Sequence, residues 1–359
     1  MRSALLLIFL ILSGCQSAID KNQTLASVKS KSVNTIQYSQ EDDLWQVIAN
    51  RQDIKSVSNL RVQSRIDWIS NHPEYLSLIS KRAEPFLYLV VSELEKQDLP
   101  IEIALLPIVE SDYYPFSYSH GTAAGLWQFI PSTGRMYGLE EDWWHADRRD
   151  VLASTQAAAS YLKDLNQMFK GDWLLSIAAY NAGPGRVQKA IDANIKLGKK
   201  TDFWSLDLPN ETEKYVPKLL ALSQVIKNPS RYNQKLLKIN NKPFLKAIEL
   251  DSQFDLALIS QWTGLSIDQI YNYNPGLKRW ATPESLPYTM LLPEEVIYSF
   301  NDNLSKQGQR PKISWTRYKI KSGDSLSLIA QSYNTTIAQI RSVNELDNDT
   351  IRIDKYLIV

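Results

Sequence analysis

The chain has 359 residues, of which 44% are hydrophobic, so it is long enough for about two domains with buried cores. Its 40 Lys and Arg nearly balance 39 Asp and Glu, which excludes a strong overall field of the kind that attracts nucleic acid. Three His and one Cys argue against a zinc site or a Cys–His catalytic pair, and a single Cys excludes a disulfide within the chain. We therefore expect no metal and no other cofactor.

The amino terminus has the pattern of a secretion signal. Arg2 precedes an apolar run from Ala4 to Leu12 that is too short to span a bilayer, and small residues follow it up to Cys15. We expect a signal peptide over residues 1–14. Residues 15–41 are rich in Ser, Lys, Asn, Gln and Thr, which predicts a solvated tether.

Helical patterns dominate the next part of the chain. Apolar residues recur at helical spacing from Leu44 onward, and the stretch from Ala157 to Phe169 predicts an amphipathic helix. Trp173 to Tyr180 is apolar nearly all round, which predicts a buried helix that ends at Gly183. Residues 42–228 are therefore expected to form an all-α domain.

The pattern changes after Asn228, where a proline follows and the helical periodicity stops. We treat residues 229–313 as a connecting region. Residues 316–359 begin with a short alternating segment and end with the short apolar run Tyr356 to Val359, which we expect to form a strand. Two apolar helical faces lie between them. This order predicts a small strand–helix–helix–strand domain.

Glu110 is the candidate for acid–base chemistry. It follows an apolar run that starts at Leu105, so we expect it at the edge of the core, where burial raises the pKa of a carboxyl group. On this stretch alone, a solvated Glu at a helix end is an equal alternative. Downstream, the small residues from Gly121 would let the backbone approach a ligand, and Gln128 carries an amide among apolar neighbours.

Four stretches of the chain form an ordered set of motifs: Glu110-Ser111, Gly125-Leu126-Trp127-Gln128, Ala179-Tyr180-Asn181-Ala182-Gly183 and Glu211-Thr212-Glu213-Lys214-Tyr215-Val216. In this order they resemble the motifs of lytic transglycosylases with a goose-type-lysozyme-like, Slt-type catalytic domain. Leu106 to Ser111 and Trp127 to Gly134 resemble in particular the membrane-bound lytic murein transglycosylase D family. The resemblance implies a mainly α, lysozyme-like catalytic domain.

The resemblance also implies the chemistry. The protein would cleave the β-1,4 bond between N-acetylmuramic acid and N-acetylglucosamine in peptidoglycan and leave 1,6-anhydro ends. Most glycosidases need two carboxylates, but Asp112 and the charged cluster from Glu140 to Asp142 are unconvincing partners, so Glu110 would act alone. The resemblance further implies that Ser111, Gln128 and Asn181 hydrogen-bond the sugar and that Tyr180 and Tyr215 orient Glu110.

The carboxy-terminal unit resembles a LysM domain through Tyr318 to Leu326, which implies binding to glycans that contain N-acetylglucosamine. It departs from the family at Asp354, where a glycine is usual before the last strand, and this leaves the affinity open. Residues 258–293 resemble a degenerate LysM-related segment that lacks the opening Gly-Asp.

The segment Leu12-Ser13-Gly14-Cys15 resembles the lipobox of bacterial lipoproteins, which implies cleavage before Cys15 and acylation of that residue. The alternative is a plain secretion signal that happens to carry a Cys. Gln16 stands where an Asp would resemble the inner-membrane retention signal. We therefore expect a lipid-anchored protein on the periplasmic face of the outer membrane of a Gram-negative cell.

Two other functions stay open on the sequence. One is a hydrolytic muramidase of the same fold, in which water replaces the sugar hydroxyl as the attacking group. The other is a non-catalytic lipoprotein that binds peptidoglycan around an inert helical domain. In each case we expect a monomer whose partners are peptidoglycan strands and, through the lipid, the membrane.

Overall fold

The computed structural model describes residues 43–55, 57–119, 121–306, 315–333 and 335–359. The signal peptide, Cys15 and the tether that the sequence predicts lie outside these described residues. Helices, a few short 3-10 turns and the loops that join them form the chain from Leu44 to Tyr232. The α-helices of this part are α1 (Leu44–Asn50), α2 (Leu60–Ser70), α3 (Tyr75–Ala83), α4 (Leu87–Glu95), α5 (Leu106–Ser111), α6 (Pro131–Met136), α7 (Val151–Met168), α8 (Trp173–Ala182), α9 (Pro184–Lys196) and α10 (Asn210–Lys227).

Side-chain caps set the starts of several helices. The Asp150 carboxylate accepts a hydrogen bond from the backbone N–H of Ala153 at the start of α7, and Asp172 does the same for Leu175 in α8. Gly183 ends α8 with φ 84°, and the next proline starts α9 at once. The helix predicted over Trp173 to Tyr180 is thus present and slightly longer.

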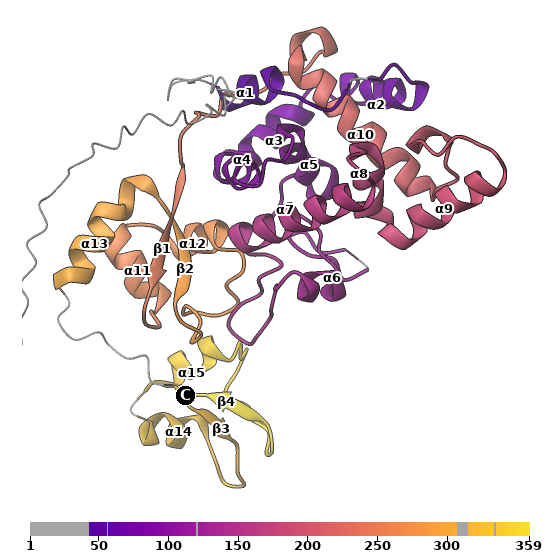
Figure 1. The fold of residues 1–359 in the computed structure, drawn as a ribbon. Coiled ribbons are helices and arrows are strands. Elements are labelled where there is room, and N and C mark those ends of the chain that lie inside the picture. The colour runs from indigo at the N-terminus through magenta and orange to yellow at the C-terminus, as the bar shows by residue number, and fades with distance from the viewer. Residues whose placement is uncertain (1–42, 56, 120, 307–314, 334) are drawn as a thin grey trace, which may run out of the picture. The chain divides into compact units, whose positions relative to one another are not determined.

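Helix α8 lies at the centre of the helical part, where α7 and α10 pack against it (Figure 1). Its residues Ile177, Ala178 and Ala179 are fully buried, as expected for a helix that is apolar nearly all round. The core around them extends from α1 to α10. The predicted mainly α domain is confirmed.

A second region follows, in which two strands enclose two helices. Strand β1 (Leu245–Leu250) pairs antiparallel with β2 (Tyr288–Pro293), with Leu245 opposite Pro293. Helices α11 (Leu256–Thr263) and α12 (Ile267–Tyr273) lie between them in sequence, and α13 (Ile297–Lys306) follows β2. The LysM-related segment expected over residues 258–293 therefore starts earlier, at β1. The sequence hides this strand because both of its ends are buried while its middle is exposed or half-buried, so it does not alternate cleanly.

The last region repeats this order on a smaller scale. Strand β3 (Arg317–Lys319) pairs antiparallel with β4 (Tyr356–Ile358), and helices α14 (Leu326–Ser332) and α15 (Ile337–Val343) come between them. Asp354, which replaces the usual glycine, has φ 64°. Asp tolerates this left-handed conformation better than most residues, so the turn before β4 keeps its shape.

One asparagine holds the same place in both strand–helix–helix–strand regions. The Asn274 amide exchanges hydrogen bonds of 2.8 and 2.7 Å with the backbone of Leu291 in β2. The Asn344 amide does the same with Ile358 in β4, again at 2.8 and 2.7 Å. Each amide thus ties the end of the second helix to the last strand, which marks the two regions as structural relatives.

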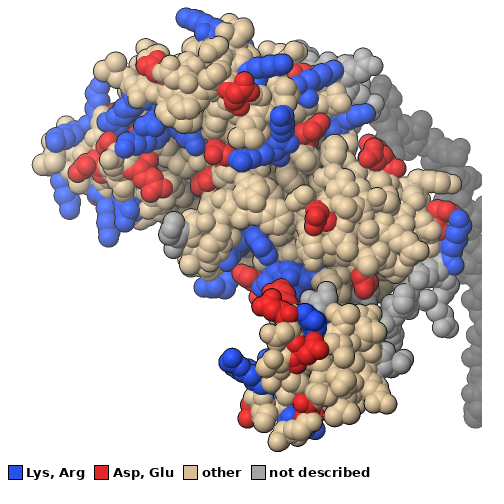
Figure 2. Space-filling view, turned by 180° about the vertical axis from the view of Figure 1, so that it is seen from behind, with Lys and Arg blue, Asp and Glu red and all other residues tan. Residues whose placement is uncertain are grey.

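Charges are mixed on the surface, as the near balance of acidic and basic residues predicts. Figure 2 shows Lys and Arg interspersed with Asp and Glu on the face that it presents. Among the described residues, no helix has both the length and the apolar character needed to cross a membrane. Likewise, the described residues contain no cluster of His, Cys, Asp and Glu suited to hold a metal ion.

Candidate active site

A hollow of about 470 Å³ opens beside the end of α5, and Glu110 forms part of its wall. Of the five predicted sugar-binding or orienting residues, four line the same hollow as Glu110, although they come from distant parts of the sequence. The lining residues are Val109, Glu110, Ser119, Ala123, Gln128, Phe129, Ile130, Thr133, Tyr161, Tyr180, Asn181, Ala182, Gly183, Glu211 and Tyr215.

Glu110 owes its position to the way α5 ends. Pro107 stands in the first turn of this short helix, where its missing N–H costs nothing. Asp112 ends the helix in the left-handed conformation with φ 49°, and Tyr113 follows with φ 57°. Two consecutive non-glycine residues in this region turn the chain sharply, and such strain concentrates at functional sites. The turn leaves Glu110 half-buried at the helix end and facing the hollow.

Burial raises the pKa of the Glu110 carboxyl to about 7. The hydrogen bond that the Tyr215 hydroxyl donates to Glu110 Oε1 and the charge of Lys218 lower this pKa, whereas the nearby Glu211 raises it. The position of Glu110 at the carboxyl end of a helix also disfavours its negative form. The side chain is therefore poised between its acid and base forms near neutral pH.

Two neighbours of Glu110 are held by backbone carbonyls. The Tyr180 hydroxyl donates to the carbonyl oxygen of Trp127 over 2.8 Å, so Tyr180 borders Glu110 without donating to it. Gln128 Nε2 donates to the carbonyl oxygens of Gly125 (2.8 Å) and Ser117 (3.2 Å). Because the amide nitrogen is occupied in this way, the Gln128 oxygen is the part that can accept a hydrogen bond from a ligand.

Asn181 belongs to a polar network at the edge of the hollow. Its Nδ2 donates to Glu211 Oε1 over 3.1 Å, and its Oδ1 accepts from the Thr212 hydroxyl over 2.7 Å. Glu211 is exposed and lines the same hollow as Glu110. The site thus contains a second carboxylate, which the search for a partner to Glu110 along the sequence did not find.

Ser111 is the one predicted sugar ligand that the structure does not bring to the hollow. Its side chain is buried, and its hydroxyl lies within hydrogen-bond distance of the carbonyl oxygens of Leu126 (2.9 Å) and Pro107 (3.1 Å). It therefore ties α5 to the following loop. The residue after Glu110 points away from the hollow because the helical backbone rotates each successive side chain by about 100°.

Gly125 also serves a different purpose from the one expected. A Cβ atom at this position would lie 2.0 Å from the carbonyl oxygen of Arg148, and Gly125 has φ 81°. The close approach is therefore between two backbone segments rather than between backbone and ligand. It sets the course of the loop that carries Gln128.

Sequence reasoning missed Glu211 and Lys218, which both influence Glu110. Both lie on α10 with Tyr215, four residues before it and three residues after it. That spacing places all three on one face of a helix, and it is the signal in the sequence that connects Glu211 and Lys218 with Tyr215.

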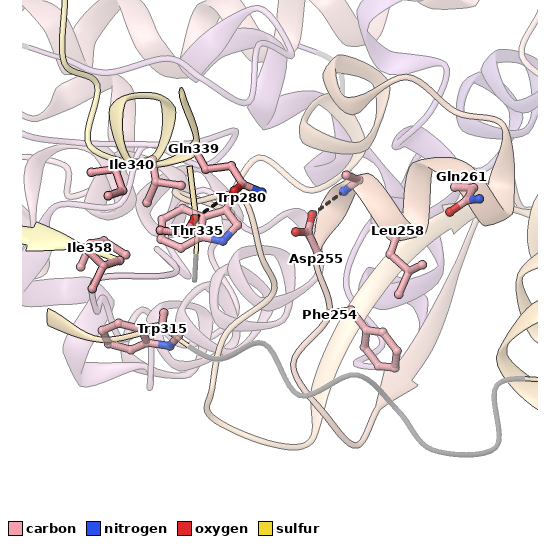
Figure 3. A pocket seen from close by; sticks show the side chains of 13 residues that line it. Phe254, Asp255, Leu258, Gln261, Trp280, Trp315, Thr335, Gln339, Ile340 and Ile358 are labelled. Atoms are coloured by element: carbon pink, nitrogen blue, oxygen red, sulfur yellow. Dashed lines mark hydrogen bonds between the residues drawn. The ribbon is translucent and has the colours of Figure 1, made fainter. Parts of the chain in front are cut away.

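Another hollow, of about 570 Å³, lies beside α11 (Figure 3). Its aromatic residues include Trp280 and Trp315, and the polar side chains of Asp255, Thr335 and Gln339 have local partners. The Asp255 carboxylate caps α11 by accepting from the N–H of Ala257 over 2.7 Å, and Gln339 accepts from the Thr335 hydroxyl over 2.9 Å. This hollow lacks a carboxylate that is free for acid–base chemistry among its described residues.

Comparison with known families agrees with this geometry. Residues 90–203 match the Transglycosylase SLT domain, and residues 318–359 match the LysM domain. Residues 244–309 match the LysM-like domain of lytic transglycosylase MltD. The fold is therefore an Slt-type, lysozyme-like helical domain followed by a LysM-like and a LysM domain.

Full-length relatives narrow the assignment. Membrane-bound lytic murein transglycosylase D of Escherichia coli strain K12 is 34% identical, over 99% of this chain and 84% of the relative. The protein of the same name from Escherichia coli O6:H1 matches equally. The chain belongs to the membrane-bound lytic murein transglycosylase D family.

Solved structures of soluble lytic transglycosylases align with a smaller part of the chain. The 70 kDa enzyme SLT70 of Escherichia coli is 24% identical over 40% of this chain and 24% of that structure, with a TM-score of 0.32. An inactive mutant of Slt from Pseudomonas aeruginosa is 23% identical over 41% of this chain and 24% of that structure, with a TM-score of 0.30.

Proposed function

We propose that this protein is a lytic transglycosylase that cleaves the β-1,4 bond between N-acetylmuramic acid and N-acetylglucosamine in peptidoglycan. Glu110 acts as its acid and its base. Membership of the lytic murein transglycosylase D family supports the substrate and the reaction class. The observation that carries the role of Glu110 is its position in the wall of the hollow with a pKa raised to about 7.

The reaction needs one group that first gives and then takes a proton. Protonated Glu110 gives its proton to the bridging oxygen, the bond from that oxygen to the muramyl C1 breaks, and the N-acetylglucosamine hydroxyl leaves. The acetamido carbonyl of the muramyl residue stabilises the cationic C1. Ionised Glu110 then takes the proton from the muramyl 6-hydroxyl, whose oxygen bonds to C1 and closes the 1,6-anhydro ring. Attack within one sugar gains from proximity what a free nucleophile lacks.

The surrounding residues support this cycle in different ways. Tyr215 donates to Glu110 Oε1 and stabilises the carboxylate formed in the first step. The Gln128 oxygen and the amide of Asn181 hydrogen-bond the sugar, and the position of both residues in the lining of the hollow supports this role. Ser111 contributes by fixing α5 to the loop after Gly125.

Replacing Glu110 tests the assignment. Glu110→Gln keeps the size of the side chain, but an amide can neither give nor take the proton. We expect turnover of purified sacculi to fall by at least about 10²–10⁴-fold, the range typical of general acid–base catalysis. Soluble product released per minute is the measurement, and unchanged circular dichroism shows that the variant is folded. Near-normal release would contradict the proposal.

The exposed Glu211 supports a second candidate function, a hydrolytic muramidase. In that case Glu211 would activate a water molecule while Glu110 protonates the leaving oxygen, as in glycosidases with two carboxylates. Glu211→Gln separates the two functions. A transglycosylase keeps its activity within about tenfold, since Glu110 alone moves the protons, whereas the hydrolase loses activity as severely as it does in Glu110→Gln.

We also propose a domain organisation and a location. Residues 1–14 are a signal peptide, residues 15–41 a tether, residues 42–228 the catalytic domain and residues 316–359 the LysM domain. The lipid on Cys15 holds the protein, as a monomer, on the periplasmic face of the outer membrane. The family's membrane-bound character and the Leu-Ser-Gly-Cys sequence support this location.

A further inference from the structure

Lys218 contacts the backbone on one side of Glu110 and lies close to Asp112 on the other. It lies on α10, three residues after Tyr215. Its Nζ donates to the carbonyl oxygens of Val109 over 3.2 Å and Ile108 over 3.3 Å, and it lies 4.0 Å from Asp112 Oδ1. Ile108 and Val109 immediately precede Glu110, and Asp112 follows it by two positions.

The two carbonyls belong to the last turn of α5, where a helix leaves acceptors without partners. A Lys side chain at this end satisfies such acceptors and opposes the negative end of the helix dipole. The half-buried ammonium therefore replaces the hydrogen bonds that α5 would gain if it continued past Asp112. It also lies on the same face of α10 as Tyr215, which donates to Glu110.

The turn after Glu110 is held from other elements as well. The Tyr75 hydroxyl of α3 donates to Asp112 Oδ1 over 2.8 Å, and Arg82 Nη1 donates to the Asp112 carbonyl oxygen over 3.3 Å. Lys218 is the group among these that also reaches the backbone before Glu110. Its removal would therefore loosen the helix end on which Glu110 sits while Tyr75 and Arg82 keep the turn in place.

We propose that Lys218 is a positioning residue for Glu110, which holds the end of α5 through Ile108 and Val109 and stabilises the Glu110 carboxylate by its charge. The inference rests on the proposed function of Glu110. As a consequence, Lys218 favours the ionised form of Glu110, which exists after the first step and takes the proton from the 6-hydroxyl. A residue that merely stabilised the fold would not change the protonation of Glu110.

The direction of the effect follows from the charges around both groups. Tyr215, Lys218 and Glu211 face Glu110 from α10, and Tyr180 faces it from α8. The charge of Lys218 lowers the pKa of Glu110, so its loss raises that pKa. The first step needs protonated Glu110, so activity is lost as pH rises through this pKa. Removing the charge of Lys218 therefore moves the alkaline limb of the pH profile to higher pH.

The charge of Lys218 itself also depends on its neighbours. Burial lowers the pKa of its ammonium group, Asp112 and Glu110 raise that pKa, and Arg65 of α2 lowers it. These opposing effects mean that the Lys218 variants have to be compared with wild type over the whole pH range.

The test compares Lys218→Met, Lys218→Arg and the control Lys214→Met, whose exposed side chain lies one turn earlier on α10. kcat and KM are measured on a short soluble glycan from pH 5 to 9. For Lys218→Met we expect kcat to fall about tenfold or more, KM to stay within about twofold, and the alkaline limb of kcat/KM to rise by roughly half a unit. Lys218→Arg should restore the wild-type limb, and Lys214→Met should match wild type throughout.

If Lys218→Met fails to fold, Lys218→Gln takes its place, because an amide still donates to the carbonyls but carries no charge. An unshifted alkaline limb in the variant that folds overturns the proposal, as does a limb that shifts equally in Lys218→Arg. Glu110→Gln keeps this outcome separate from the proposed function. If Glu110→Gln stays active, the proposed function is wrong. If Glu110→Gln is inactive while Lys218→Met behaves as wild type, only the proposed role of Lys218 is wrong.

Discussion

The raised pKa of Glu110 affects stability as well as chemistry. An unfolded Glu loses its proton near its ordinary pKa of 4.5, whereas folded Glu110 keeps it until about pH 7. The folded state therefore binds the extra proton between these values, and its stability falls as pH rises through this window. Above pH 7 the folded protein holds a half-buried carboxylate, and the favourable effects of Tyr215 and Lys218 only partly offset its loss of hydration.

This predicts that Glu110→Gln stabilises the protein at pH 8 but not at pH 4.5 or below. The shift corresponds to a gain of about 1–3 kcal/mol in unfolding free energy at pH 8, with the lower end expected because Glu110 is partly exposed. Urea denaturation at both pH values measures it. Equal effects of the substitution at the two pH values would contradict the raised pKa.

The sequence predicts those residues of this site whose role follows from the residue type and its neighbours along the chain. Glu110 stands out as a carboxylate after an apolar run, and Tyr215 stands out by the motif resemblance. Ser111 is misleading because the sequence does not show where a side chain points once a short helix ends in a left-handed turn. The spacing from Tyr215 places Lys218 on the same face of α10, but its carbonyl partners leave no trace in the residue types, so the sequence does not predict its role.

At the scale of elements, the loop after α5 depends on Gly125. A Cβ atom here would lie 2.0 Å from the Arg148 carbonyl oxygen, and the backbone has φ 81°. Gly125→Ala should therefore lower the unfolding free energy by about 3 kcal/mol or more, since two backbone segments would have to separate. Gly138→Ala is the matched control, with φ 79° and no atom within 4 Å of the added Cβ.

The control should cost only about 1 kcal/mol, the usual strain of a non-glycine residue in the left-handed region. Thermal unfolding of both variants provides the comparison. Equal losses of unfolding free energy in the two variants would show that the backbone at Gly125 moves to accept the added Cβ. The close approach to Arg148 would then have little effect on stability.

Helices and small strands of this chain differ in how well the sequence reveals them. Helix α8 is unmistakable because it is apolar, capped by Asp172 and ended by Gly183. Strand β1 is not, because its partner β2 lies more than thirty residues away and supplies the burial that the local sequence does not show. The same holds for the matching roles of Asn274 and Asn344, which only the strand pairing reveals.

At the scale of the whole molecule, chemistry and substrate binding are predicted to be separable. Glu110 and its neighbours lie in the helical domain, whereas the LysM domain packs its own small core. Removing residues 316–359 should weaken binding to sacculi, because the domain raises the local concentration of glycan, and should spare cleavage of a short soluble glycan. Sedimentation with sacculi and turnover of the short glycan measure the two effects.

We expect only a modest loss of binding, since Asp354 replaces the usual glycine of the domain. If the truncated and folded protein sediments with sacculi as fully as the intact chain, the LysM domain has no binding role. If it loses activity on the short glycan, the two functions are not separable.

The membrane anchor is a separate prediction about the whole molecule. Cys15→Ala removes the only thiol of the chain, so neither acylation of sulfur nor cleavage before this residue can follow. We expect the variant to keep its precursor mass and to incorporate no labelled palmitate in cells. Label in the variant would show that the anchor lies elsewhere.

The central claim is that Glu110 alone drives an attack within the muramyl residue, and the products record this directly. Mass spectrometry of the soluble material released from purified sacculi should show fragments that end in 1,6-anhydro-N-acetylmuramic acid, each lighter by one water than a hydrolytic fragment. The same products should come from Glu211→Gln. Reducing N-acetylmuramic acid ends would contradict the account in favour of a hydrolase, and no released material would contradict it in favour of a binding protein.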